Sequence, residues 1–176
     1  MRKKLSVRAL CEGALLVALA QGLGYVKFAQ MPLGGSVTLA MLPIVVFAVR
    51  WGWQAGLLAG FAFGLLQLTL DGAYAWGWQS MIGDYLLAFT PLGLAGLFRG
   101  KKWGLVWGLL LGALCRFGVH YVVGATVWAS STPENFASPW VYSLAYNGAY
   151  MGLSTLICLV AAILLRKLWD LLPKPE

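Results

Sequence analysis

The sequence predicts an all-α integral membrane protein, in which residues 1–176 form a single bundle of six transmembrane helices with both termini in the cytoplasm. Of its 176 residues, 60% are hydrophobic and 11% are charged, and the mean hydropathy is +0.76. This composition is typical of a polytopic membrane protein and not of a soluble domain. The apolar runs are long and continuous, without the alternation of barrel strands, which disfavours a β-barrel.

The net charge of +7 would suit a nucleic-acid-binding protein, but the distribution of the charges excludes that class. The basic residues lie at the ends of apolar runs and not along one solvated face. The three cysteines, Cys11, Cys115 and Cys158, are isolated within apolar stretches. Their spacing fits neither a metal site nor a disulfide framework, so we interpret them as small hydrophobic residues of helices.

The first predicted helix covers about residues 5–27. Its basic start, apolar middle and Ala18-Leu19-Ala20 are similar to a signal peptide with a cleavage site. Glu12 interrupts the apolar part, and removal would leave an odd number of spans, so we expect the segment to be retained. A loop at residues 30–36 leads to a short second helix at about 37–49. At ~1.5 Å per residue this helix barely crosses a ~30 Å hydrocarbon core.

The third helix, at about 51–70, and the fifth, at about 103–129, carry glycines at four-residue intervals. Such ribbons of small residues let helix backbones approach closely in lipid. We therefore predict two packing faces, made by Gly52, Gly56, Gly60 and Gly64 and by Gly104, Gly108 and Gly112. Asp71-Gly72 is a turn signal before the fourth helix, at about 78–98. Ser138-Pro139 predicts the start of the sixth helix, which ends near Arg166-Lys167.

The basic residues orient these spans. With six spans, only Lys27 lies at the ends that face one side. The ends that face the other side carry Arg2, Lys3, Lys4, Arg8, Arg50, Arg99, Lys101, Lys102, Arg166, Lys167 and Lys174. By the positive-inside rule, both termini are cytoplasmic.

Three predicted helices place polar side chains at a similar depth in the outer half of the membrane. At ~1.5 Å of rise per residue, Asp84 lies roughly 9 Å from the outer end of its helix and His120 roughly 12 Å. Tyr142 and Asn147 lie roughly 5–12 Å deep on the same scale. Polar groups in hydrocarbon are costly unless they pair, face a cavity or bind a ligand. We therefore predict a small-molecule site between these helices, to which Tyr85 also contributes.

The residue types around this site favour a flat, positively charged ring. Gly124 and Trp128 share a helical face with His120, and Tyr74 adds an aromatic side chain near the outer end of the fourth helix. Aromatic faces and one carboxylate suit such a ring through stacking and cation–π attraction. Arg116, roughly 18 Å below the outer surface, is compatible instead with an anion.

Structural interpretations of the same residues stay open. Trp76, Trp78 and Trp140 fit an interfacial aromatic belt. Asp84 could form a buried ion pair with Arg116, and a single histidine in an apolar helix is often a packing residue. The convergence of polar groups at one depth favours a binding site over these interpretations.

Short motifs along nearly the whole chain resemble those of a known family, the thiamin-specific S component of energy-coupling factor (ECF) transporters. These motifs are Gly72-Ala73-Tyr74, Asp84-Tyr85, Ala88-Phe89, the run from Leu92 to Arg99, His120 with Trp128, and Tyr142-Ser143-Leu144-Ala145 with Asn147. Two features depart from the family. Asp84 stands where a glutamate also occurs, and Gly34-Gly35 stand where an aromatic residue is expected over the ligand.

The resemblance implies a multi-pass protein of the bacterial plasma membrane that binds thiamin from outside in a deep pocket, without a cofactor or enzymatic activity. Asp84 would lie near the thiazolium or the aminopyrimidine, and His120 and Trp128 would stack on the thiazolium. Tyr142 and Asn147 would hydrogen-bond the pyrimidine end. The implied lining is completed by Tyr74, Tyr85 and Gly124.

The resemblance also implies partners. Ala14 and Ala18 match a small-residue motif through which S components dock on a transmembrane coupling subunit, which works with two ATPase subunits. The chain itself has no phosphate-binding loop, since Gly100-Lys101-Lys102 lacks the required spacing. We expect it to capture the vitamin outside and release it inside when these partners drive it.

Three other functions stay open at the level of sequence. The chain could be an S component for another vitamin, such as riboflavin or an anionic one that engages Arg116. It could be a membrane enzyme that uses Asp84 and His120 as acid and base, or a structural membrane subunit without a ligand.

Overall fold

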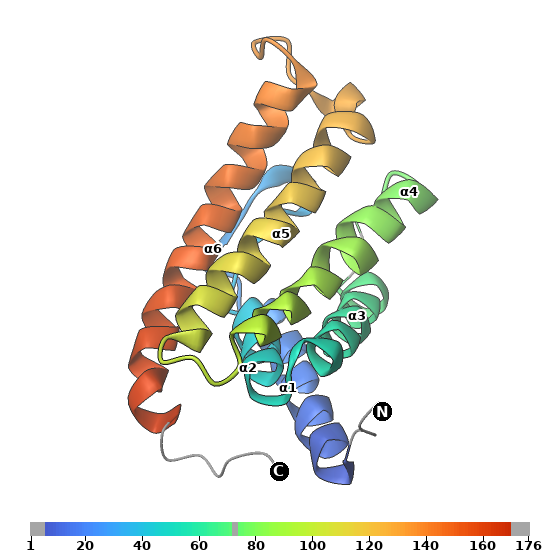
Figure 1. Cartoon of the computed structure of the whole chain (residues 1–176). Coiled ribbons are helices and arrows are strands. Elements are labelled where there is room, and N and C mark those ends of the chain that lie inside the picture. Colours follow the sequence, from blue (N-terminus) through green and yellow to red (C-terminus); the bar gives the residue numbers. More distant parts are fainter. Residues whose placement is uncertain (1–5, 72–73, 170–176) are drawn as a thin grey trace.

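The computed structural model describes residues 6–71 and 74–169, without the side chains of residues 167–169. The described chain is a bundle of helices with one small hairpin of two strands (Figure 1). Predictions for Arg2, Lys3, Lys4, Lys174 and the Gly72-Ala73 part of one motif lie outside these residues, as does the side chain of Lys167. The elements are α1 (Val7–Tyr25), β1 (Ala29–Gln30), η1 (Pro32–Gly34), β2 (Ser36–Val37), α2 (Met41–Trp51), α3 (Trp53–Leu70), α4 (Trp78–Ser80), η2 (Met81–Leu87), η3 (Thr90–Phe98), α5 (Gly104–Thr126), η4 (Ala129–Ser131) and α6 (Pro139–Trp169).

By length and composition, five helical stretches of the described residues can cross a membrane. They are Val7–Tyr25, Trp53–Leu70, Trp78–Phe98, Gly104–Thr126 and Pro139–Arg166. The bundle of membrane helices predicted from the sequence is therefore confirmed. The second predicted helix, α2, has 11 residues, or about 16 Å, and does not span a ~30 Å core by itself.

The predicted start of that second helix, at residue 37, is wrong. Ser36 and Val37 instead pair with Ala29 and Gln30 as an antiparallel hairpin, and the helix begins at Met41. The residues between hairpin and helix are irregular, with a bend at Leu39 and a turn at Ala40. They therefore cannot supply the hydrogen bonds of a helix, and their backbone groups need other partners.

Side chains of α6 supply those partners. The backbone N–H of Thr38 donates to Ser154 Oγ at 3.3 Å, and Ser154 Oγ donates to the Ser36 carbonyl at 3.4 Å. The thiol of Cys158 points at the Thr38 carbonyl at 3.8 Å. This non-helical segment, residues 36–40, is thus held against a helix far away in the sequence. Its polar backbone is satisfied inside the protein, as hydrocarbon surroundings require.

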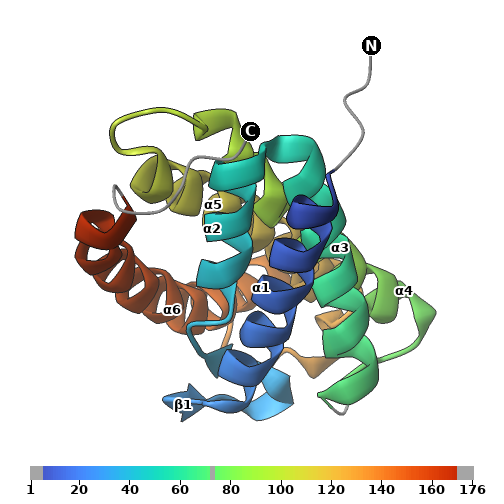
Figure 2. The same cartoon turned by 90° about the horizontal axis from the view of Figure 1, so that it is seen from below.

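The short helix α2 forms the centre of the core. Nine of its 11 residues are buried, and α1, α3, η3 and α5 pack around it. Figure 2 shows α1 lying against α2 and α3. Near the end of α2, the buried Arg50 forms an ion pair with Glu12 of α1. The largest fully buried side chains of this core include Phe63, Met41, Ile44, Leu92, Leu109 and Val45.

The two predicted glycine ribbons are packing faces, as the sequence indicated. A methyl group on Gly60 of α3 would lie 2.5 Å from the Phe89 carbonyl oxygen, and one on Gly64 would lie 2.6 Å from that of Tyr85. Gly104 of α5 is equally close to the Phe98 carbonyl. The helix Trp78–Phe98 therefore lies in backbone contact with α3 on one side and α5 on the other. Gly52 differs, since its φ of 98° places it in the turn between α2 and α3.

The element ends fall into two groups. The turn between α2 and α3, the turn between η3 and α5, and the end of α6 lie at the lower end of the bundle in Figure 1. Helix α4 and the connection between α5 and α6 lie toward the upper end. The described basic residues at the lower ends are Arg8, Arg50, Arg99, Lys101, Lys102 and Arg166, which is the separation of charge that the sequence predicted.

Candidate functional site

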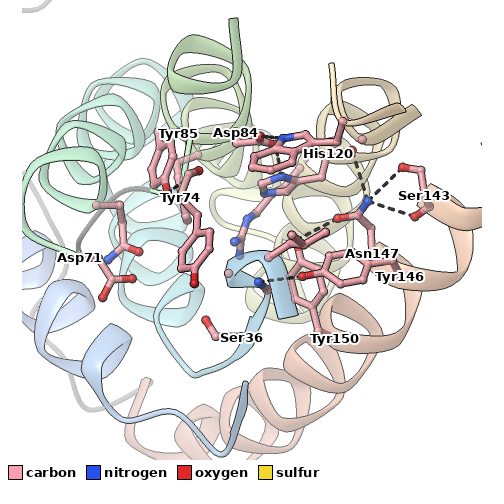
Figure 3. A pocket seen from close by; sticks show the side chains of 18 of the residues that line it. Ser36, Asp71, Tyr74, Asp84, Tyr85, His120, Ser143, Tyr146, Asn147 and Tyr150 are labelled. Carbon is pink, nitrogen blue, oxygen red and sulfur yellow. Dashed lines mark hydrogen bonds and ion pairs between the residues drawn. The ribbon is translucent and has the colours of Figure 1, made fainter. Parts of the chain in front are cut away.

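One cavity brings together all eight residues predicted to line a ligand site. These are Tyr74, Asp84, Tyr85, His120, Gly124, Trp128, Tyr142 and Asn147. The cavity has a volume of about 820 Å³, including the space open to the exterior. Figure 3 shows Asp84 with His120 on one wall and Asn147, Tyr146 and Tyr150 on another. The predicted convergence is therefore real, while the role of each residue in binding stays a prediction.

Asp84 lies in a π-helical turn of its helix. It lies in η2, a wide π-helical turn between the α-helical start at Trp78 and the tighter 3₁₀ end, and such turns often occur at functional sites. Gly83 allows η2 to approach α5, because a methyl group there would lie 2.6 Å from Val123 Cγ2. This close approach places the Asp84 carboxylate beside α5.

Both oxygens of the Asp84 carboxylate have partners on α5 and just beyond it. Oδ1 lies 2.9 Å from Nδ1 of His120, and Trp128 Nε1 donates to Oδ2 at 2.8 Å. The carboxylate favours the His120 tautomer that carries its proton on Nδ1. His120 Nε2 is buried without a hydrogen-bond partner in the described part of the chain.

Arg116 does not form the ion pair with Asp84 that the sequence left open. Asp84 pairs with His120 instead, and no ion pair of Arg116 occurs within residues 6–71 and 74–169. The guanidinium lies 4.3 Å from the ring centre of Phe89, a cation–π contact. Arg116 lines the cavity.

The hydrogen bonds of Asn147 are made within the protein. Its amide N–H groups donate to the Ser143 carbonyl at 3.0 Å and to the His120 carbonyl at 3.3 Å. Its carbonyl oxygen accepts from the Tyr150 hydroxyl at 3.0 Å. Gly124 permits this close approach of α6 to α5, because a methyl group at Gly124 would lie 2.4 Å from Ser143 Oγ of α6. Asn147 therefore joins α5 to α6 as well as lining the cavity.

The hairpin loop of residues 29–37 covers part of the cavity, and Tyr146 holds it there. The Tyr146 hydroxyl accepts from the Gly35 N–H at 3.0 Å and donates to the Pro32 carbonyl. Gly34 and Gly35, where an aromatic residue was expected, face aromatic side chains of other elements. A methyl group on Gly35 would lie 2.8 Å from both the Tyr146 hydroxyl and the Tyr150 ring, and one on Gly34 would lie 3.0 Å from Tyr74. The volume that an aromatic side chain at position 35 would need is thus already filled.

Sequence reasoning missed several residues of the lining. Asp71 was interpreted only as a turn residue, and nothing local marked Gln67 as facing a cavity. The four-residue spacing of Tyr142, Tyr146 and Tyr150 was the signal that could have found Tyr150. Beyond the eight predicted residues, the lining also includes Leu33, Gly34, Gly35, Ser36, Phe89, Arg116, Ser143 and Tyr146. For Arg116 the sequence had left a role in binding open.

Ala14 and Ala18, predicted as a partner interface, lie away from this cavity. Both are exposed on α1. Ala14 also borders an apolar groove between α1 and its neighbours, with Leu10, Phe47 and Leu58 among the groove residues. Small exposed residues beside an apolar groove leave room for another helix to approach.

Comparison with known proteins places the chain in a family. The sequence model of the family described as "Thiamine transporter protein" matches residues 10–172. The chain is 34% identical to the thiamine transporter ThiT of Bacillus subtilis, over 89% of this chain and 88% of that protein. It is 28% identical to ThiT of Lacticaseibacillus paracasei, over 91% of this chain and 87% of the relative.

A solved structure supports the same assignment. The structure of ThiT from Listeria monocytogenes superimposes with a TM-score of 0.86 at 25% sequence identity, covering 96% of this chain and 98% of the other. The relatives are transporters and not enzymes. This chain is a multi-pass bacterial membrane protein that belongs to the thiamine transporter family.

Proposed function

We propose that this protein is the thiamin-binding S component of an ECF-type vitamin transporter, which captures thiamin outside the cell and releases it inside. The observation that carries the proposal is the Asp84 carboxylate, fixed by His120 and Trp128 in a cavity with aromatic walls. Thiamin combines a cationic thiazolium with a flat aminopyrimidine. A partly buried carboxylate and aromatic faces are the groups that attract such a molecule.

The arrangement suggests how each group would act. Asp84 would neutralise the cationic ring or accept from the amino group, while His120 and Trp128 would present their ring faces to the thiazolium. Tyr142 would hydrogen-bond the pyrimidine end. Asn147 would act largely by holding α5 against α6, because its hydrogen bonds are already made to Ser143, His120 and Tyr150. Tyr74, Tyr85 and Gly124 would complete the walls.

We propose six membrane crossings, with residues 1–176 as one domain and both termini cytoplasmic. Five of these crossings are the helices that are long enough to span the membrane alone. The sixth would be made by α2 together with the non-helical segment 36–40. The helix supplies about 16 Å, and the non-helical residues 36–40, of which Ser36 and Val37 are extended, lengthen the crossing toward a ~30 Å core. The hydrogen bonds to Ser154 and Cys158 support this proposal, because they satisfy the non-helical backbone inside the protein.

The energy for release would come from partners. A transmembrane coupling subunit would dock on the exposed face of α1 at Ala14 and Ala18, and two ATPase subunits would drive it. The basic ends of the helices would then face the cytoplasm, in agreement with the positive-inside rule.

Arg116 favours a second candidate, an S component for an anionic vitamin. Its guanidinium lines the cavity and has no ion-pair partner among the described residues, so a carboxylate or phosphate would suit it. Competition between thiamin and anionic vitamins separates the two candidates. An acid–base enzyme that uses Asp84 and His120 is disfavoured by the transporter relatives.

A fluorescence titration tests the proposal. We expect thiamin to quench the tryptophan fluorescence of the purified protein in a saturable way at submicromolar concentration, while riboflavin and biotin have no effect. Replacing Trp128 by phenylalanine should remove most of the quenching. The matched control is Trp107→Phe, because Trp107 lies on α5, the helix that leads to Trp128, but is 55% exposed and outside the cavity. A flat titration with folded wild-type protein would refute the thiamin assignment.

Tyr146→Phe tests the role of the covering loop. The change removes the hydroxyl that bridges Gly35 and Pro32, at a net cost of about 1 kcal/mol per hydrogen bond. We expect thiamin to associate and dissociate faster, each by roughly fivefold, in stopped-flow fluorescence. A change confined to dissociation would indicate a direct contact with thiamin and contradict the covering role. Tyr25→Phe is the control, because its hydroxyl also donates to a backbone carbonyl, that of Leu70, but outside the cavity.

A further inference from the structure

A second carboxylate lines the same cavity as Asp84. Asp71 lies at the end of α3, and it lines the cavity together with Tyr74. Figure 3 shows Asp71 beside Tyr74, on the opposite side of the cavity from Asn147 and Tyr146. Tyr74 is 57% exposed, so this side belongs to the outer edge of the site. A cation that enters or leaves would therefore meet Asp71 and Tyr74 at the edge and Asp84 further inside.

Asp71 already holds a cation that is part of the protein. The ammonium of Lys27 lies 3.5 Å from Asp71 Oδ1, with both side chains about a quarter exposed (26% and 22%). Lys27 is not among the residues that line the cavity. A partly exposed ion pair of this kind contributes only about 0–1 kcal/mol. A cationic ligand can therefore exchange with Lys27 at little cost in free energy.

The charges around this edge favour a cation. The acidic and basic side chains that the structure describes toward the outer ends of the helices are Lys27, Asp71, Asp84 and Glu134. Arg116 also lines the cavity, so three carboxylates stand against two cationic side chains, Lys27 and Arg116. The basic residues behind the overall charge of +7 lie mostly at the opposite ends of the helices. The local field at the edge is thus opposite in sign to the net charge, and such local fields govern the association of charged ligands.

We propose that Asp71 and the ring of Tyr74 form an outer cation subsite, which a cationic ligand occupies on its way to Asp84 and for which Lys27 is a tethered competitor. The proposal rests on the proposed function, since thiamin is the cation considered. At the subsite, the carboxylate attracts the positive ring and the tyrosine face receives it. In the empty protein, Lys27 keeps Asp71 paired. When a ligand is present, Lys27 competes for Asp71 and weakens its binding of the ligand, so that the ligand moves on to Asp84.

The two members of the ion pair should act in opposite directions on ligand capture. Stopped-flow fluorescence measures thiamin association at about 0.01 M salt, where the screening length is about 30 Å, and at about 1 M, where it is about 3 Å. At low salt we expect Asp71→Asn to slow association by about threefold or more and Lys27→Gln to accelerate it by a similar factor. At high salt both variants should approach the wild-type rate.

Two controls separate this proposal from a structural role of the ion pair. A neutral analogue, with carbon in place of the thiazolium nitrogen, should associate at the same rate with the wild type and both variants. Glu134→Gln, which removes an exposed outer carboxylate that does not line the cavity, should leave thiamin association nearly unchanged. If Asp71→Asn does not fold, two other variants still test the proposal. Thiamin association should be faster with Lys27→Gln and close to the wild-type rate with the charge-preserving Asp71→Glu.

The results have distinct meanings. Opposite effects that disappear with the neutral analogue support the outer subsite. Equal slowing by both variants, or the same effect on the neutral analogue, shows that the pair only holds the segment after α1 against the end of α3, and overturns the subsite. Unchanged rates overturn it as well, while thiamin binding itself stays intact. A wild-type protein that does not bind thiamin overturns both this proposal and the proposed function.

Discussion

Asp84→Asn should weaken thiamin binding by about two orders of magnitude, which corresponds to about 3 kcal/mol. The change removes the negative charge that would neutralise the ligand. It also replaces one carboxylate oxygen by an NH₂ donor, although both present partners, His120 Nδ1 and Trp128 Nε1, would donate to this side chain. One of these donors is therefore left without an acceptor in a partly buried site, which adds to the loss. Calorimetry or fluorescence titration with the purified variant measures the effect.

The neutral thiamin analogue shows which part of the ligand Asp84 serves. If the carboxylate neutralises the thiazolium, the variant and the wild type should bind the analogue with similar affinity. If it accepts from the aminopyrimidine, the loss should persist with the analogue. Asp84→Glu is the matched control, because it keeps the charge and should retain affinity within about tenfold. Binding of thiamin by Asp84→Asn within about twofold of the wild type would contradict the central role of this residue.

Replacing Ala14 and Ala18 together by leucine should abolish ATP-dependent thiamin uptake by cells and leave thiamin binding unchanged. Both alanines are exposed, and Ala14 borders an apolar groove. Two larger side chains would hold a docking helix away from the small-residue surface of α1. The cavity is lined by other elements, so affinity measured on the purified protein should not change.

A control variant tests whether any bulky substitution on the lipid-facing surface has this effect. Gly152 of α6 is exposed and has no atoms within 4 Å of an added methyl group. Gly152→Leu should therefore support normal uptake. Uptake by the Ala14 and Ala18 variant at the wild-type level would refute docking at this face. Concentrative uptake in cells without the coupling and ATPase subunits would refute the dependence on partners altogether.

The sequence by itself determined the membrane class, the positions of most helices and the two glycine ribbons. These properties depend on local composition and on the spacing of residues along one helix. A long apolar run predicts a membrane helix, and glycines four residues apart share one face. The same arithmetic placed Asp84, His120 and Asn147 at a common depth, and these side chains do line one cavity.

Only the tertiary structure decided which groups pair across helices. The partners of Asp84 are His120 and Trp128 and not Arg116, because Gly83 and the π-helical turn set how η2 meets α5. The non-helical segment 36–40 could not be predicted from the sequence, since α6 side chains from more than a hundred residues away satisfy its backbone. The place of Asp71 in the cavity depends likewise on how α3 packs. Local patterns determine which face of a helix is apolar, whereas the contacts of each polar group depend on which helices lie next to each other.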